Sequence, residues 1–278
     1  FQTIGACVER LIELRARQPK VTGGSREALP DGPLGLTFDD VSFSYNDQDV
    51  VLKNLSFKLE PGKVLGLLGR TGSGKTTLAR LVFRLYDPTA GHIWLDGSEM
   101  CETKLETLRS RVAIVTQDVQ LFRASVRDNL TFFDRGIPDE RILSVLDELE
   151  LGDWINSLPA GLDTELGAGG HSLSAGEAQL LAFTRVFLRD PGLVILDEAS
   201  SRLDPATEQR LEVVIDRLLH DRTAIIIAHR LGTVGRADQV LILDEGCISE
   251  FGDRRTLAAD PESQFHHLLQ TGLEEVLV

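Results

Sequence analysis

The sequence predicts an α/β protein whose central element is a parallel β-sheet with helices on both faces. Five short runs are apolar throughout, which is typical of strands that are buried on both sides. Segments between several of these runs carry apolar residues at helical spacing, and a glycine-rich turn joins the first run to the helix after it. The apolar runs are 64–68, 112–115, 193–196, 223–228 and 240–243.

The N-terminal part is expected to lie outside this sheet. Apolar residues recur at helical spacing from Phe1 to Arg17, which indicates a helix. The stretch 18–35 holds three prolines and four glycines and is interpreted as a linker. The chain starts at Phe1 without a signal-peptide pattern, so we interpret it as a fragment of something longer. The expected division is 1–35 for the helix end and linker, and 36–278 for the domain.

The domain is expected to begin with antiparallel strands and to contain a helical insertion. Alternating patterns at 36–43 and 50–59 predict two strands, and Pro61-Gly62 predicts the turn before the first buried strand. A helix is expected at about 74–85, after the glycine-rich turn. Residues 121–187 lack continuous apolar strands and show helical spacing instead, so a helical subdomain is predicted there.

Composition and charge exclude several classes of protein. Hydrophobic residues make up 42% of the 278 residues and charged residues 26%, as in ordinary globular domains. Lys plus Arg number 29 and Asp plus Glu 43, and the net charge of −14 disfavours binding to nucleic acid, whose phosphates require a basic face. Three distant cysteines without a CxxC pair argue against disulfides and zinc, and no apolar run is long enough to span a bilayer.

The segment 69–76 reads G-R-T-G-S-G-K-T and matches the phosphate-binding pattern G-x-x-x-x-G-K-[ST]. It follows an apolar strand and opens a helix, and these correct flanks disfavour a chance glycine turn. Backbone N–H groups converge on the phosphates in such a loop, Lys75 reaches the β and γ phosphates, and Thr76 is expected to ligate Mg²⁺. The expected nucleotide-binding residues are Gly69, Arg70, Thr71, Gly72, Ser73, Gly74, Lys75, Thr76 and Thr77.

Two carboxylates end the apolar run at 193–196. Asp197 is expected to hold Mg²⁺, and Glu198 is expected to polarise the water that attacks the γ-phosphate. Seen alone, Asp-Glu after a strand is commonly a solvated turn. After a phosphate-binding loop, the same pair forms the second half of an NTPase site at the carboxyl edge of the sheet.

Three further residues support a nucleotide-binding site only when they are considered together. His229 follows the run 223–228 and is expected to contact the γ-phosphate and orient Glu198. Gln117 follows the run 112–115 and is expected to complete the Mg²⁺ shell, while Tyr45 offers a ring for stacking on a base. Taken singly, a packing histidine, an unremarkable glutamine and a half-buried sheet tyrosine are the commoner interpretations.

The order of these motifs resembles the nucleotide-binding domain of an ABC transporter. The segment Leu173-Ser174-Ala175-Gly176-Glu177 is similar to the L-S-G-G-Q helix start of that family, and Ser201-Arg202-Leu203-Asp204 follows the acidic strand. The resemblance runs from Leu36 to the C-terminus. It implies a RecA-like P-loop NTPase core with an antiparallel β subdomain and an inserted helical subdomain, and ATP hydrolysis with Mg²⁺.

The resemblance also implies partners. Two such domains face each other head to tail in the family, so that Ser174 and Gly176 act on the ATP of the partner domain, and Asp204 belongs to the same nucleotide-binding set. The segment 121–130 resembles the exporter pattern that meets the coupling helix of a membrane domain. By the same resemblance the N-terminal helix is the cytoplasmic end of a last transmembrane helix, although a simple packing helix is the alternative.

We therefore expect an exporter half-transporter at the cytoplasmic face of a membrane, with the transmembrane domain in the same chain and this fragment itself soluble. One alternative is a soluble ABC ATPase acting in DNA repair or translation, which the acidic balance and the single ATPase cassette disfavour. Another is a mainly regulatory ATP-binding half of an exporter, which the presence of Glu198 and His229 opposes. The exported substrate is chosen by membrane segments and is not named by these residues.

Four positions in three segments depart from the family pattern. Ala175 adds a methyl group where backbone approaches phosphate, and Glu177 adds a negative charge where the family commonly has Gln. Ala168 replaces a usual glutamate, and Arg202 stands where the loop usually has Ala. Because the catalytic half is intact while the signature is altered, a heterodimer is slightly favoured over a homodimer. The alternative is that Ala-Gly-Glu is a tolerated variant of the signature.

Overall fold

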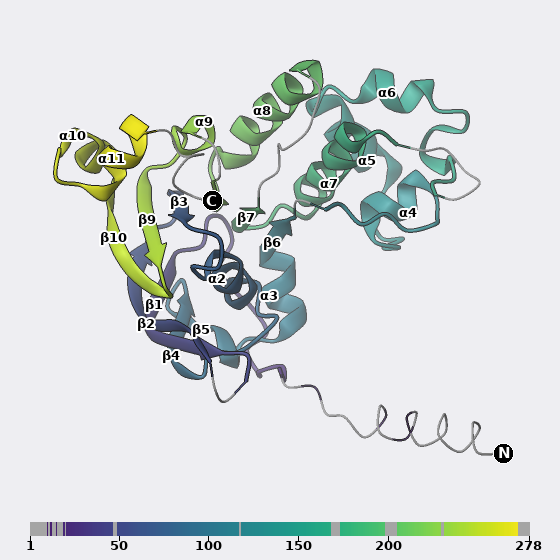
Figure 1. Cartoon of the computed structure of the whole chain (residues 1–278). Helices are drawn as coiled ribbons and strands as arrows, with labels where there is room; N and C mark the ends of the chain where they lie inside the picture. The colour runs from purple at the N-terminus through teal and green to yellow at the C-terminus, as the bar shows by residue number, and fades with distance from the viewer. Residues whose placement is uncertain are drawn as a thin grey trace.

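The computed structural model describes residues 10, 12, 15, 19, 21–46, 49–116, 118–167, 173–197, 205–228 and 231–271. Its centre is a six-stranded sheet in the order β10-β9-β3-β8-β7-β6, which is parallel except for the antiparallel hairpin between β9 and β10 (Figure 1). The strands are β3 (Val64–Gly69), β6 (Val112–Val115), β7 (Leu193–Asp197), β8 (Thr223–Ile227), β9 (Gln239–Asp244) and β10 (Cys247–Asp253).

The side chains of the parallel strands alternate between two hydrophobic cores, one on each face of the sheet. In β3, Leu65 and Leu67 point into one core and Val64 and Leu68 into the other. The period of two residues explains why both faces are apolar and why the strand reads as a continuous apolar run. The five predicted strands are confirmed, each to within one residue at either end.

A second, antiparallel sheet covers one face of this core in the order β2-β1-β4-β5. The predicted strands at 36–43 and 50–59 are confirmed, but β4 and β5 were missed. The signal was present, since Asp96-Gly97 joins β4 to β5 and both residues have positive φ, as in the tightest hairpin turns. The four strands are β1 (Leu36–Ser44), β2 (Val50–Leu59), β4 (Ala90–Leu95) and β5 (Ser98–Glu99).

The same face carries two helices and a short helical turn. The helix predicted at 74–85 is shorter than expected, because Arg84 takes a left-handed conformation with φ 50° and the chain turns away after Phe83. These elements are α2 (Lys75–Val82), η1 (Met100–Glu102) and α3 (Leu105–Arg111).

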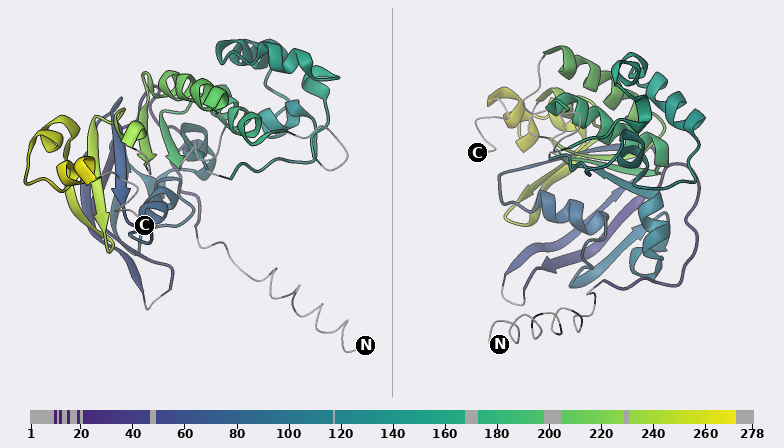
Figure 2. Two further views of the ribbon diagram at one scale, coloured as in Figure 1. Left: turned by 45° about the horizontal axis from the view of Figure 1, so that its top comes forward. Right: turned by 90° about the vertical axis from the view of Figure 1, so that its right-hand side faces the viewer.

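Helices between β6 and β7 form a lobe beside the sheets, which we call the helical lobe and define as 126–189. Figure 2 shows this lobe on the opposite side of α8 from α10 and α11. Ser125 begins α4 as an N-cap, since its hydroxyl accepts a hydrogen bond from the Asp128 amide at 3.0 Å. The helices are α4 (Val126–Thr131), α5 (Asp139–Glu148), α6 (Gly152–Ser157), η2 (Gly161–Asp163) and α7 (Ala175–Arg189).

The remaining helices pack on the face of the central sheet shared with the helical lobe. Within the described ranges, no helix is long and apolar enough to cross a bilayer. The helix expected at 1–17 falls almost entirely outside the described residues, and the division of the chain into 1–35 and 36–278 stays a prediction. The helices are α8 (Pro205–Leu219), α9 (Leu231–Val234), α10 (Arg254–Ala259) and α11 (Gln264–Thr271).

The segment 21–35 is not a loose linker, because it is hydrogen-bonded along the edge of the domain. The amides of Gly24 and Arg26 donate to carbonyls of Thr103 and Glu102. The buried Arg84 adds a hydrogen bond from its guanidinium to the Thr22 carbonyl at 2.8 Å. The chain upstream of the first strand is thereby tied to the C-terminal end of α2.

Candidate nucleotide-binding site

The phosphate-binding loop lies between the central strand β3 and the start of α2. Two of its glycines are required both because their φ angles are positive and because a Cβ atom would clash with a neighbouring strand. Gly69 has φ 143°, and a Cβ there would lie 2.2 Å from the Leu243 carbonyl oxygen. Gly74 has φ 110°, and a Cβ there would lie 2.5 Å from Leu52 of β2. The loop therefore lies directly against two neighbouring strands.

Lys75 is the first residue of α2, and its long side chain folds back over the loop. Its Nζ atom donates to the carbonyls of Gly69 at 2.5 Å and Arg70 at 2.8 Å, and the residue is only 6% exposed. A positive charge is thus held at the helix N-terminus, where backbone N–H groups already attract anions. The hydroxyl of Ser73 is buried in the same loop. A Cβ at Gly69 would lie 2.6 Å from this hydroxyl.

A cavity of about 330 Å³ opens over this loop and the first turn of α2. Thr71 and Gly72 are exposed on its rim, together with Thr76, whose hydroxyl side chain is available to solvent. The structure therefore brings together most of the loop residues predicted from the sequence around one hollow, although Gly69, Arg70 and Ser73 do not line it. The lining residues are Val51, Thr71, Gly72, Gly74, Lys75, Thr76 and Thr77.

Tyr45 lies near this loop with its ring held on several sides. Its hydroxyl is 3.0 Å from the Thr77 hydroxyl and accepts a hydrogen bond from Arg80 at 2.9 Å. The rings of Phe43 and Tyr86 pack edge-on against it at 4.9 and 5.1 Å, and 38% of Tyr45 remains exposed. Thr77 thus contacts Tyr45 through its hydroxyl, and Arg80 is a supporting residue that the sequence analysis missed.

Asp197 ends β7 at the carboxyl edge of the sheet. The strand register places it opposite Ile227 of β8, which in turn pairs with Leu67 of β3, so Asp197 lies two strands from the phosphate-binding loop. The hydrogen bond to Tyr45 is the largest cause of the raised pKa of the Arg80 guanidinium, and the negative charge of Asp197 adds to it. The hydroxyl of Thr76 and the carboxylate of Asp197 are oxygen donors of the kind that Mg²⁺ prefers.

Four predicted site residues, Gln117, Glu198, Asp204 and His229, lie outside the described residues, as do the unusual positions Ala168 and Arg202. Their roles stay predictions. Among the residues that are described, no group of three or more His, Cys, Asp or Glu side chains is placed to hold a metal ion by itself.

The signature segment begins α7 and does not line the cavity over the phosphate-binding loop. Ser174 is the N-cap, and its hydroxyl accepts a hydrogen bond from the Glu177 amide at 3.2 Å. The Glu177 carboxylate accepts in return from the Ser174 amide at 2.7 Å, which completes a capping box. Gly176 packs against α8, since a Cβ there would lie 2.2 Å from Thr207 Cγ2.

Glu177 therefore has a local role that the sequence analysis did not assign. The signal was available, because Ser-x-x-Glu before an apolar run is the usual capping-box pattern. A second acceptor position of the carboxylate receives the indole N–H of Trp154 at 2.9 Å. A separate cavity of about 310 Å³ adjoins this segment and is lined by both of these residues together with Ser174 and Thr207.

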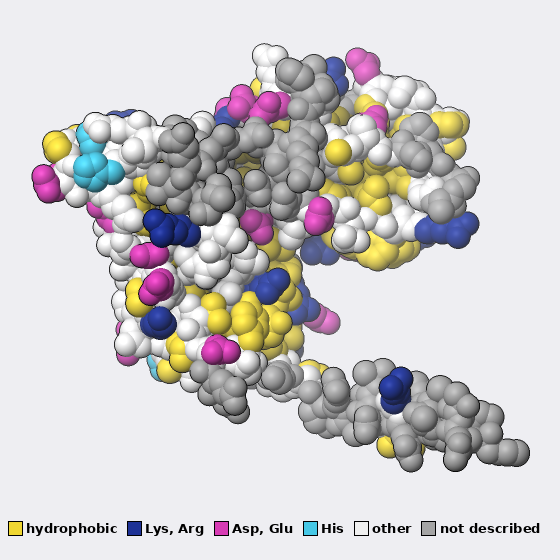
Figure 3. Space-filling model, viewed as in Figure 1, with side chains coloured by type: hydrophobic (Ala, Val, Ile, Leu, Met, Phe, Trp, Pro, Cys, Tyr) yellow, Lys and Arg dark blue, Asp and Glu magenta, His cyan; other side chains and the backbone are white. Residues whose placement is uncertain are grey.

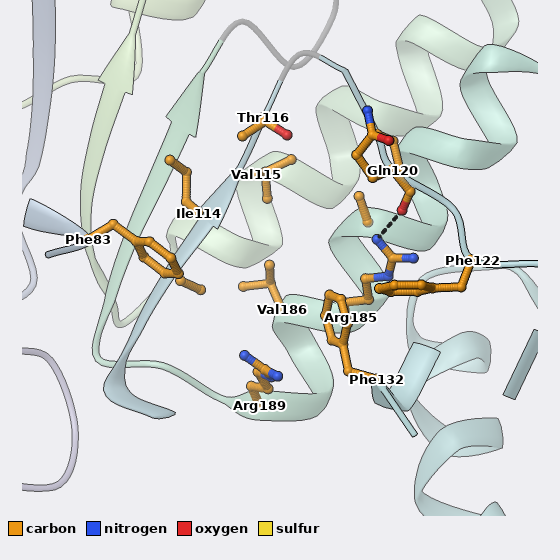
Figure 4. Close-up of a pocket in the computed structure, with 13 residues that line it drawn as sticks. Phe83, Ile114, Val115, Thr116, Gln120, Phe122, Phe132, Arg185, Val186 and Arg189 are labelled. Carbon is orange, nitrogen blue, oxygen red and sulfur yellow. Dashed lines mark hydrogen bonds between the residues drawn. The ribbon is translucent and has the colours of Figure 1, made fainter. Parts of the chain in front are cut away.

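A third cavity, of about 250 Å³, lies between β6 and α7 (Figure 4). Arg185 crosses it and donates hydrogen bonds to the backbone carbonyls of Asn129 and Gln120, while Phe132 stacks against its guanidinium at 4.7 Å. Burial, reinforced by the nearby Arg189, lowers the pKa of Arg185 to about 10. Figure 3 shows apolar surface on the underside of the helical lobe, with basic side chains beside it.

Comparisons with known proteins agree with this arrangement. The family model described as ABC transporter matches residues 52–201. The mitochondrial iron-sulfur clusters transporter ATM1 of Candida glabrata is 38% identical over 266 residues, and the ATP-dependent lipid A-core flippase of Pseudomonas fluorescens is 40% identical over 273 residues. These matches take in 94% and 97% of this chain, but only 37% and 45% of the relatives.

A solved structure of a bacterial Atm1-family ABC exporter with ATP bound superposes with a TM-score of 0.84 at 32% sequence identity. The match covers 97% of this chain and 47% of that one, so the chain spans less than half the length of the proteins it matches. The predicted fold class is confirmed by this superposition together with the family match. The chain therefore belongs to the ABC transporter family, as an ATP-binding domain of the exporter type.

Proposed function

We propose that this domain hydrolyses ATP with Mg²⁺ and thereby powers the export of a substrate across a membrane. The observation that carries the proposal is the phosphate-binding loop, with Lys75 folded over it at the N-terminus of α2 and a 330 Å³ cavity above it. A loop of this shape offers converging N–H groups, a helix dipole and a fixed cation to the phosphates of a nucleotide.

Each residue of the site has a separate task in this proposal. Lys75 binds the β and γ phosphates, and Thr76, Asp197 and Gln117 would hold Mg²⁺, which neutralises phosphate charge when it is bound. Glu198 takes the proton of the attacking water as general base. His229 contacts the γ-phosphate and orients Glu198. Tyr45 stacks on the base with a ring that Arg80 and its aromatic neighbours already hold in place.

A second domain of the same family completes the site. The signature residues Ser174 and Gly176 do not line the cavity over the phosphate-binding loop of their own chain, which supports the proposal that they serve the ATP of a partner in a head-to-tail dimer. We favour a heterodimer over a homodimer because Ala175 departs from the family pattern and is exposed at the start of α7. Glu177 lends this preference less support, since its carboxylate accepts hydrogen bonds from two N–H groups.

The cavity around Arg185 is the proposed contact with a transmembrane domain at the cytoplasmic side of the membrane. It is lined mainly by apolar side chains, and the partly exposed rings of Phe122 and Phe132 stand at its edge. The segment containing Phe122 is the one whose sequence resembles the exporter pattern. A coupling helix from the membrane domain fits this setting, because an amphipathic helix offers apolar side chains to such a groove.

The test is a pair of substitutions in the 278-residue chain. Glu198→Gln keeps the shape of the general base and removes its basicity, so ATP binding should persist while phosphate release falls by at least about a hundredfold. Lys75→Ala should weaken the binding of a fluorescent ATP analogue itself. Turnover that survives in Glu198→Gln would remove Glu198 from the mechanism, and equal affinity in Lys75→Ala would contradict the assignment of the loop.

A further inference from the structure

The start of α7 is held by a second contact besides its own cap. The two oxygens of Glu177 are divided between two donors: Oε2 accepts from the Ser174 amide at 2.7 Å, and Oε1 accepts from the indole Nε1 of Trp154 at 2.9 Å. Trp154 lies on α6, and its ring packs against the core of the helical lobe. One carboxylate therefore joins the signature to the helix beside it.

The chemistry of this junction discriminates between Glu and Gln. Both partners of residue 177 are N–H donors, so both of its terminal atoms must be acceptors. A carboxylate meets this requirement, whereas an amide offers one acceptor oxygen and one NH₂ group that is itself a donor. With Trp154 in place, Gln at position 177 would set a donor against a donor at one of the two contacts and lose that hydrogen bond.

We propose that Trp154 and Glu177 form a matched pair that positions the signature of this chain, and that Glu is required at position 177 because Trp154 is present. Trp154 is a positioning residue, since it acts on Ser174 through Glu177. Gly176 supports the same orientation by its close packing on Thr207 of α8. The Glu in the signature is then an adaptation to its neighbour and not a handicap.

The inference rests on the proposed function in one respect, because the positioned Ser174 matters for activity only if the signature meets ATP in a dimer. The first measurement is therefore independent of ATP. The chain has two tryptophans, so a ¹H–¹⁵N spectrum shows two indole signals, and Trp94 of β4 is the internal control. Glu177→Ala should move the Trp154 indole signal and leave that of Trp94 in place. An unmoved Trp154 signal would overturn the pair.

The second measurement is a double-mutant cycle on hydrogen exchange at the Ser174 amide. In the parent chain Glu177→Gln should speed exchange about tenfold, the effect expected of one lost hydrogen bond to a charged acceptor. In the Trp154→Phe background the competing donor is gone, the Gln oxygen can serve the Ser174 amide, and the same change should have an effect of about twofold or less. Equal effects in the two backgrounds would overturn the requirement for Glu.

The third measurement carries the pair into function. ATP-dependent association and phosphate release should fall severalfold in Glu177→Gln and recover in part when Trp154→Phe is added. If Glu177→Gln instead raised association in the parent chain, the adaptation would be refuted. If the exchange cycle showed coupling while no form of the chain associated with itself in the presence of ATP, the matched pair would stand and a head-to-tail homodimer of this chain would be the part that failed.

Discussion

Arg84 is the most heavily hydrogen-bonded buried charge in the described part of the chain, and its removal gives a sharp test of the packing. All five of its N–H donors are used: Nε donates to Asp87, Nη1 to the carbonyls of Met100 and Thr103, and Nη2 to those of Thr22 and Cys101, all at 2.8 to 3.0 Å. The side chain is 2% exposed.

Arg84→Met preserves most of the length of the side chain and removes every donor. Five hydrogen bonds at a net value of about 1 kcal/mol each would contribute about 5 kcal/mol. Breaking a buried ionic network by removing one partner costs about 3 to 5 kcal/mol, which is the same range. We therefore expect a loss of about 3 to 5 kcal/mol, seen as a fall in melting temperature of about 5 to 9 °C.

The assay is thermal unfolding followed by circular dichroism, with Arg109→Met as the matched control on the exposed face of α3. The control should change the free energy of unfolding by less than about 0.5 kcal/mol. Arg84→Lys should recover only part of the loss, because one ammonium group cannot span carbonyls that the guanidinium fork reaches in two directions. If Arg84→Met lost no more stability than Arg109→Met, the proposed anchoring of the segment upstream of β1 would be refuted.

The remaining predictions concern the site and one titrating contact. Arg80→Met should weaken binding of a fluorescent ATP analogue about fivefold by releasing the Tyr45 ring, and unchanged affinity would contradict this. Gly176→Ala should destabilise the chain by about 1 to 3 kcal/mol in urea unfolding, because its methyl group overlaps the α8 side chain, and a neutral effect would contradict that packing. Glu99 raises the pKa of His92 by accepting from Nδ1, so this contact stabilises the fold below the unfolded-state pKa of about 6.5 and is lost as pH rises through the raised pKa. Titration of the His92 ring by NMR should give a lower pKa in Glu99→Gln, and an equal pKa would disprove the contact.

Local patterns in the sequence were sufficient for the parallel sheet and the phosphate-binding loop. Apolar runs such as 64–68 and 193–196 identify strands buried on both faces. The phosphate-binding pattern is recognised by its glycines, two of which are required by the close approach of Leu243 and Leu52. The helix after the loop was predicted too long because residue-level propensity does not reveal that Arg84 leaves α2 and donates to four carbonyls that are distant in sequence, as well as to the nearby Asp87. Tertiary contacts decided that boundary.

The contacts between distant segments could not be predicted in the same way. Nothing local to Trp154 indicates that its indole meets Glu177, and nothing near Tyr45 indicates that Arg80 holds its hydroxyl. Glu177 itself was interpreted as an added charge near phosphate, although its spacing from Ser174 also matched a capping box. A charge in a motif has to be weighed against the local hydrogen bonds that its position in a helix makes available.

The order of strands in the central sheet has a consequence for how the chain is made. The innermost strand, β3, ends at Gly69, but the two strands that flank it begin only at Thr223 and Gln239. A ribosome therefore releases β3 long before either neighbour has been synthesised, and both edges of this apolar strand wait for pairing while the whole helical lobe emerges. Pairing of such distant segments is slow to form. During synthesis the nascent chain thus presents an apolar strand with two unpaired edges for a long interval, which makes shielding by a chaperone most valuable before β8 appears.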